Sequence, residues 1–194
     1  MKLPPRRPTL YFKDFQDRLT AQHVEAWFKT LALQISQAQS QEDWEKSIIH
    51  WNELKCHLDT HLELASLAFY RNTQDAACEA EERRLREEIE PPYKKLNAEI
   101  RQSVLQSPYR NPLQEKFGSQ YFAILQLEHE AFLPQNVAIE TKISHLTSQY
   151  TKTTGQGELE VHGKKYPLSH HAKFSNSPDV ALRRESFKSY SGWF

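Results

Sequence analysis

The sequence contains few glycines and cysteines, no excess of either charge and no long apolar run. Five glycines among 194 residues are too few and too dispersed for a phosphate-binding loop, and their scarcity favours helices over a turn-rich sheet protein. Two cysteines, Cys56 and Cys78, form no recognisable disulfide or metal-binding pattern, which fits a reducing compartment. Twenty-five basic residues balance twenty-five acidic ones, so nothing attracts a nucleic acid or an anionic membrane over long range.

The chain also has no candidate membrane segment in its sequence. No stretch approaches the roughly 20 apolar residues that a membrane span needs, and the basic start at residues 2–7 is not followed by the apolar core of a secretory leader. We therefore expect a cytoplasmic protein that has neither a membrane nor a nucleic acid as a partner.

Apolar residues recur at spacings of three and four through most of the chain, which predicts long amphipathic helices. The expected helices cover about residues 20–35, 41–71, 75–106, 112–132, 134–150 and 177–194. Pro91-Pro92 is expected to break or kink the third helix, because proline lacks the amide hydrogen and clashes with the preceding turn. The predicted fold class is therefore all-α, an antiparallel bundle of long helices with one small β-hairpin at about residues 158–168.

Each helix is expected to pack through one apolar stripe. The 41–71 helix carries a nearly heptad seam, interrupted at Lys55, of Trp44, Ile48, Trp51, Leu58, Leu62, Ala65 and Phe69. The other predicted stripes are Val24, Trp27, Leu31 and Ile35; Tyr93, Leu96, Ile100 and Val104; Phe117, Tyr121 and Leu125; Ile139, Ile143, Leu146 and Tyr150; and Val180, Phe187 and Tyr190. The charged run from Glu79 to Glu90 is expected to face solvent.

The segment at 158–168 alternates in polarity around a turn that contains Gly163, which predicts a hairpin. A two-residue loop would place Glu160 opposite Lys165. Since an isolated hairpin is marginally stable, Leu159 and Tyr166 must pack on helices. The final helix is expected to begin with Ser177 as the cap and Pro178 at the first position.

Two regions are predicted. Residues 1–18 read as an extended arm whose aromatics, Tyr11, Phe12 and Phe15, dock on the body; the alternative is a loose tail. Residues 19–194 read as a helical lobe that is incomplete at its C-terminal end, because the last helix has no stop signal before Gly192-Trp193-Phe194. The alternative is a frayed end whose aromatics dock locally. Trp193, Phe194 and Phe187 are then expected to form an exposed apolar surface.

The 41–71 helix holds a candidate metal site. His50, Glu53, His57 and His61 are spaced so that all four share one face, and His57 and His61 have the i,i+4 spacing of paired zinc ligands. The alternative is a polar flank beside the apolar seam. Zinc-peptidase motifs also require glutamate directly after the first histidine, and Leu58 stands there instead.

Two further histidine groups are weaker candidates. His129-Glu130 begins like H-E-x-x-H, but Leu133 occupies the position of the second ligand. His170-His171 is expected in a loop after the hairpin, exposed or capping. The residues alone therefore predict a helical scaffold with no catalytic, cofactor-binding or metal-binding residue assigned.

Several short sequence segments, in the same order along nearly the whole chain, resemble segments of one protein family. They are Ser107-Pro108-Tyr109-Arg110 with Glu115-Lys116-Phe117-Gly118, Ser148-Gln149-Tyr150-Thr151-Lys152, the hairpin segment through Tyr166-Pro167-Leu168, and Asp179 to Phe187. This sequence resembles the N-terminal region of the oligoendopeptidase F-like zinc peptidases, relatives of thimet oligopeptidase.

The resemblance implies a substrate-channel lobe of a zinc-dependent oligopeptidase that hydrolyses peptide bonds in short peptides. The family's H-E-x-x-H helix and its third, glutamate ligand lie further along the chain and have no counterpart in residues 1–194. Zinc would activate a water and the motif glutamate would take its proton, both in a C-terminal catalytic domain that would be this lobe's partner. Two alternatives stay open: a stand-alone helical interaction protein, or a weak metal-binding module on the His50/His57/His61 face.

Overall fold

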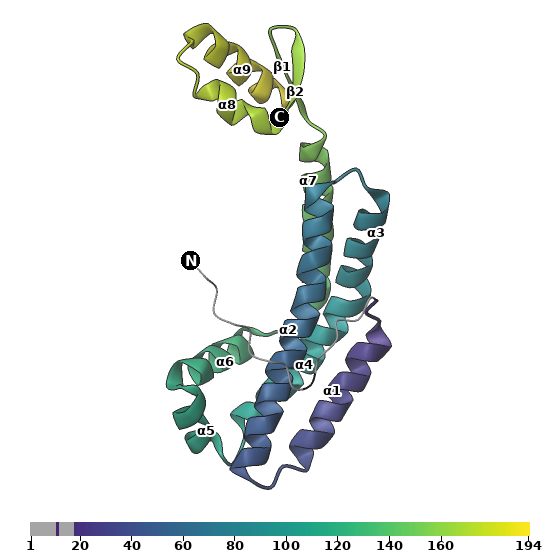
Figure 1. The fold of residues 1–194 in the computed structure, drawn as a ribbon, viewed down its shortest axis with the longest axis vertical. Coiled ribbons are helices and arrows are strands. Elements are labelled where there is room, and N and C mark those ends of the chain that lie inside the picture. The colour runs from purple at the N-terminus through teal and green to yellow at the C-terminus, as the bar shows by residue number, and fades with distance from the viewer. Residues whose placement is uncertain (1–10, 12–17) are drawn as a thin grey trace.

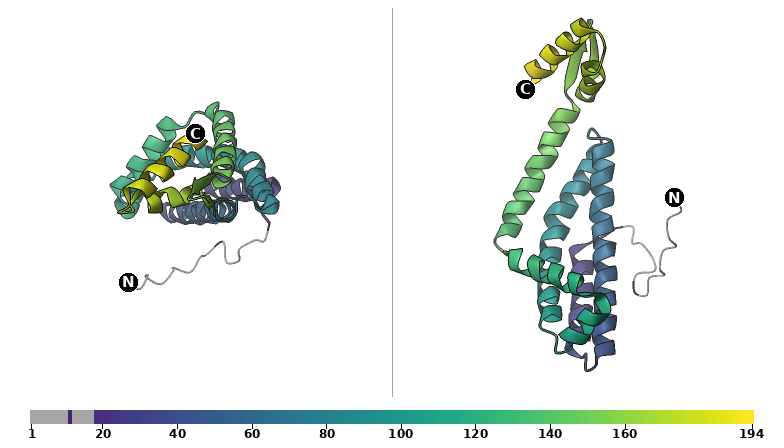
Figure 2. Two further views of the ribbon diagram at one scale, coloured as in Figure 1. Left: turned by 90° about the horizontal axis from the view of Figure 1, so that it is seen from above. Right: turned by 90° about the vertical axis from the view of Figure 1, so that its left-hand side faces the viewer.

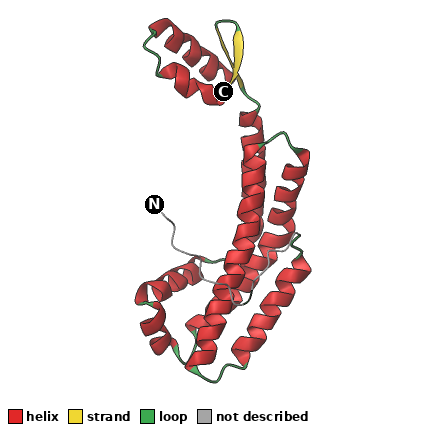
Figure 3. Ribbon diagram, viewed as in Figure 1, coloured by secondary structure: helices red, strands yellow, loops and turns green. Residues whose placement is uncertain are grey.

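The computed structural model describes residue 11 and residues 18–194, and it consists almost entirely of helices (Figure 1). The bundle contains α1 (Ala21–Ser36), α2 (Gln41–Arg71), α3 (Ala76–Arg84), a π-helical turn (Leu85–Ile89), α4 (Glu90–Leu105), α5 (Arg110–Phe117), α6 (Ser119–Ala131) and α7 (Asn136–Gly155). A smaller C-terminal unit contains β1 (Glu158–Val161), β2 (Lys164–Pro167), a 3-10 turn (Leu168–His170), α8 (His171–Ser175) and α9 (Val180–Trp193). The predicted helical class with one small hairpin is confirmed for the described part of the chain (Figure 3).

Side-chain caps explain where the first helices begin. Thr20 accepts a hydrogen bond from the His23 amide at the start of α1. Ser40 and Asp43 form a reciprocal capping box at the start of α2. The predicted bounds of α2, residues 41–71, are confirmed.

The main core lies where α1, α2 and α4 pack together. Trp51 of α2 is fully buried at its centre, and its indole Nε1–H donates to Oδ1 of Asn97 on α4 at 2.7 Å. Leu54, which the predicted seam omitted, is also fully buried beside the interruption at Lys55. On α1 the buried aromatic is Phe28, and the predicted Trp27 is only partly buried at the edge of the core.

Of the predicted break or kink at Pro91-Pro92, the break is wrong. The chain stays helical from Ala76 to Leu105, passing through the π-helical turn Leu85–Ile89. This turn changes the hydrogen-bond pattern immediately before the prolines, which then occupy the first turn of α4, where backbone amides need no partner within the α-helix.

The single helix predicted at 112–132 is two helices. Gly118 separates α5 from α6 with φ 96° and ψ 145°, a conformation outside the helical region that a residue with a Cβ rarely adopts. Leu113, Phe122 and Leu125 are buried, whereas Phe117 and Tyr121, which were predicted to point inward, are only partly buried.

The C-terminal unit has its own small apolar cluster around Leu159, Val161 and Leu168. The predicted pairing of Glu160 with Lys165 is confirmed, and the turn residues His162 and Gly163 both have positive φ, as a two-residue hairpin turn requires. Every residue of the main core precedes α7 and every residue of this cluster follows it, so the chain passes between the two once, through α7 and residues 155–157.

The last helix has a different N-cap residue from the one predicted, and it buries a different face. Oδ1 of Asp179 caps α9 by accepting from the Ala181 and Leu182 amides, while the Ser177 hydroxyl accepts from the Asp179 amide ahead of the helix. Ser177 is therefore not the cap, and Pro178 lies before the first helical residue. This start places Leu182 and Tyr190 against the hairpin. Val180 and Phe187, predicted to point inward, are exposed.

Helix α7 stands beside the bundle, as the right-hand view of Figure 2 shows. Its predicted inward stripe, Ile139, Ile143, Leu146 and Tyr150, is exposed. The physical reason is that Ser148 and Lys152, on the opposite face of α7, bind glutamates of α3. At the side of the helix, Glu140 pairs with Lys94 of α4. No helix in the described residues is long and apolar enough to cross a membrane.

Candidate interaction surface

The histidine face of α2 exists as predicted, but it is buried. His50, His57 and His61 are each 7–8% exposed. The ring of Tyr11 stacks on His50 with a centroid separation of 4.1 Å, and the Tyr11 amide donates to Glu53 Oε2 at 2.7 Å. Tyr11 therefore contacts the body as predicted, while Phe12 and Phe15 lie outside the described residues.

The environment of these imidazoles favours their neutral form. Burial lowers the pKa of His57, and it lowers the pKa of His61 to about 4, with the neighbouring His57 adding to the shift. The His57 and His61 rings meet edge to face at 5.0 Å, and Trp27 meets the His57 ring edge to face at 5.3 Å. These rings pack as core aromatics.

The described residues do not fit a zinc ion. A protein zinc site needs at least three convergent His, Cys, Asp or Glu ligands, and no such group of three occurs among residues 11 and 18–194. Cys56 is exposed and Cys78 partly buried, and the two are not joined. No chemical step is assigned to these side chains.

The other candidate histidines also lie in helical segments, where they contact neighbouring side chains or are partly buried. His170 and His171 do not lie in a loop, as predicted, but in the 3-10 turn and at the start of α8. His171 stacks on Tyr190 at 4.1 Å and its Nδ1 lies 3.1 Å from Ser186 Oγ, so it joins α8 to α9. His129 is partly buried on α6.

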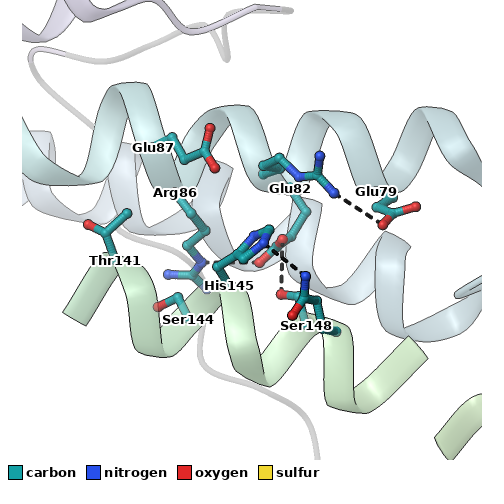
Figure 4. A pocket seen from close by; sticks show the side chains of 10 residues that line it. Glu79, Glu82, Arg86, Glu87, Thr141, Ser144, His145 and Ser148 are labelled. Atoms are coloured by element: carbon teal, nitrogen blue, oxygen red, sulfur yellow. Dashed lines mark hydrogen bonds and ion pairs between the residues drawn. The ribbon is translucent and has the colours of Figure 1, made fainter. Parts of the chain in front are cut away.

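A polar contact layer holds α7 against α3 and α4 (Figure 4). Lys152 Nζ lies 2.6 Å from Glu79 Oε2, and Ser148 Oγ donates to Glu82 Oε2 at 3.3 Å. Near the other end of α7, Lys94 of α4 pairs with Glu140 at 2.7 Å. Contacts distributed along the helix therefore fix which of its faces turns inward.

Glu82 corrects the prediction that the 79–90 run faces solvent. It is only 5% exposed, because α7 covers it. Arg86 Nε lies 3.3 Å from Glu82, and the same guanidinium also binds Glu90 and the hydroxyl of Ser66. A buried carboxylate requires such charged and hydrogen-bonding partners.

An open groove of about 650 Å³ lies where the C-terminal ends of α2 and α7 meet the C-terminal unit. Its aromatic lining consists of Tyr70, Tyr150, Tyr190 and Phe194, and Arg71 adds a positive charge. These residues come from segments up to 124 positions apart in the sequence (from 70 to 194), so no local spacing could have predicted the groove.

The predicted apolar surface near the end of the chain is partly confirmed. Phe187 and Phe194 are exposed, and Phe194 lines the groove. Trp193 instead packs on the apolar cluster of the C-terminal unit, because it lies beside Gly157, where the absence of a side chain leaves room for the indole.

The described residues form a helical lobe with a groove at one end. Comparison with known proteins identifies the family to which it belongs. Residues 12–132 match the model of the peptidase M3 N-terminal domain. Because this match covers more than half of the sequence, the chain belongs to the peptidase M3 family through that domain.

Solved structures extend the likeness to the C-terminal unit. A protein assigned as oligoendopeptidase F matches with TM-score 0.85 and 24% identity, over 95% of this chain and 33% of that one. One from Bacillus anthracis strain Ames matches with TM-score 0.85 and 19% identity, over 97% and 34%. PZ peptidase A with an inhibitor matches with TM-score 0.85 and 23% identity, over 95% and 33%. The chain thus shares their fold and spans about a third of their length. No curated protein matches it.

Proposed function

We propose that this chain is the N-terminal lobe of a zinc-dependent oligopeptidase and forms one wall of the channel that admits short peptides. The observation that carries the proposal is the match of residues 12–132 to the M3 N-terminal domain in a chain that spans a third of its solved relatives. Hydrolysis and the zinc ion are assigned to the remaining two thirds, because the described residues bring no three metal ligands together. The lobe alone is then inactive.

The groove supports a role in holding peptides. Tyr70, Tyr150 and Phe194 offer aromatic rings, the two tyrosines with a hydroxyl group, and Arg71 can attract a carboxylate of a peptide. Holding a peptide in one orientation raises the rate of a reaction carried out on a facing domain. The sparse cysteines and balanced charge support the further proposal that the enzyme acts in the cytoplasm.

The proposal is tested first by reading the coding sequence downstream of position 194. An H-E-x-x-H helix there, in frame or shifted, supports the proposal. Unrelated sequence contradicts it and favours a stand-alone helical interaction protein.

The second test uses the downstream-encoded region as a separate protein. Cleavage of a quenched fluorescent peptide is expected from the mixture, and from neither component alone. A chelator of zinc should abolish it. Cleavage by the 194-residue chain alone would contradict the proposal, as would a stable complex that cleaves nothing.

A further inference from the structure

Helix α7 turns its polar side toward its own bundle. The residues on that inner side, at spacings of three, four and one, are Val137, Thr141, Ser144, His145, Ser148 and Lys152. Val137 is the buried residue of this helix, and the others meet Glu79, Glu82 and Arg86 through a polar layer. The side of α7 that is already partnered is therefore the polar one.

The apolar side of α7 points away from the bundle. Ile139, Ile143, Leu146 and Tyr150 follow one another at spacings of four, three and four, and they are 54–62% exposed. At about 100° of rotation per residue they form a single row opposite Ser148. We call these four residues the α7 ridge.

The ridge has the pattern of a surface that binds another helix. Single exposed apolar residues are ordinary on proteins, but a row of four on a helix whose other face is polar reverses the usual arrangement. Spacings of three and four present side chains to a neighbouring helix that crosses at a shallow angle. The row extends over eleven residue steps, roughly 16 Å, which matches about three turns of a partner helix.

We propose that the α7 ridge binds an amphipathic helix supplied by the remaining two thirds of the peptidase. This inference rests on the proposed function. The solved relatives carry about twice as much polypeptide outside the matched region as inside it, so a large partner is available within the same enzyme. The ridge also continues into the groove, because Tyr150 lines it together with Tyr70 and Phe194. A helix on the ridge would thus reach the groove proposed to hold peptides.

The test places charge on the ridge. The variant I143E/L146E places two glutamates on exposed ridge positions, and the control L127E places one glutamate on α6 at a residue that is 65% exposed. Binding of each chain to the separately expressed downstream-encoded region is measured by analytical ultracentrifugation. The ridge variant is expected to bind at least about tenfold more weakly, and L127E to bind as the unmodified chain does. Circular dichroism should show the same helix content in all three.

The other outcomes each overturn the inference. Unchanged affinity of I143E/L146E means that the partner binds elsewhere, and equal losses in I143E/L146E and L127E mean that the ridge is not the specific site. Concentration-dependent dimers that the ridge variant abolishes would assign the ridge to a second copy of this chain. Peptide cleavage by the unmodified mixture is recorded in parallel. If the unmodified mixture cleaves the peptide and I143E/L146E binds as tightly as the unmodified chain, only the ridge inference is overturned. If binding depends on the ridge but the complex cleaves no peptide, only the proposed function is overturned.

Discussion

The indole of Trp51 and the side-chain amide of Asn97 meet at 2.7 Å inside the core, joining α2 to α4. We predict that Asn97→Ala lowers the free energy of unfolding by about 1–3 kcal/mol, because it leaves a buried indole N–H without an acceptor. Urea unfolding measures the change. Gln102→Ala, on the exposed side of the same helix, should change stability by less than about 0.5 kcal/mol. Equal effects of the two substitutions would mean that the hydrogen bond contributes nothing.

Stability should fall when the pH is lowered from about 6.5 to 4. The pKa of His61 is about 4 in the folded protein, against 6.5 for the free side chain, because burial and the nearby His57 and Arg84 outweigh the attraction of Glu81. Between these values the unfolded chain binds a proton that the folded chain does not, so acid favours unfolding.

His61→Phe should make the melting temperature less dependent on pH across this window. A residual dependence is expected from His57, whose pKa burial also lowers. A pH profile identical to that of the unmodified chain would show that His61 does not titrate as described.

Removing the partner of Glu82 should be costly. Arg86→Met leaves a buried carboxylate without its guanidinium and is predicted to destabilise the bundle by about 3 kcal/mol, whereas E82Q/R86M should cost less because the Glu82 charge is removed as well and Glu90 keeps Lys94 as a partner. Arg83→Met is the matched control. Arg83 also pairs with a glutamate but is about half exposed, so its loss should cost less than about 1 kcal/mol. The measurement is unfolding of the three variants by guanidinium. Equal losses of stability in Arg86→Met and Arg83→Met would contradict this account.

The C-terminal unit should be sensitive to a single methyl group at Gly157. A Cβ there would lie 2.1 Å from Leu168 Cδ1 and 2.8 Å from Trp193, so Gly157→Ala is predicted to speed hydrogen exchange of the β1 and β2 amides. Gly192→Ala has free space and lies within α9. It should leave the exchange unchanged or slow it slightly.

Local signals in the sequence predict much of this fold. The bounds of α2 are predicted from the nearly heptad seam that runs from Trp44 to Phe69, and the structure adds the cap at Ser40. The pairing of Glu160 with Lys165 follows from a turn with Gly163 at its second position. In each case the residues that decide the structure lie within a few positions of one another.

The remaining features depend on distant residues. Periodicity identifies the stripe on α7 but cannot say which face turns inward, and that is decided by Glu79, Glu82 and Lys94, more than 40 residues earlier. The same contacts bury Glu82, which the charge run alone suggests is exposed. The groove combines three distant segments and has no sequence signature at all.

The chain passes only once between its two apolar clusters, and residues 155–157 end that passage. This arrangement affects which recombination events between related genes preserve the fold. A recombination event within these three codons would divide neither cluster, because no residue belongs to both. Chimeras that combine residues 1–156 of this chain with the hairpin and α9 of a relative should therefore retain both sets of buried contacts. Exchange at Gly118 would separate α5 from α6, which share the main core.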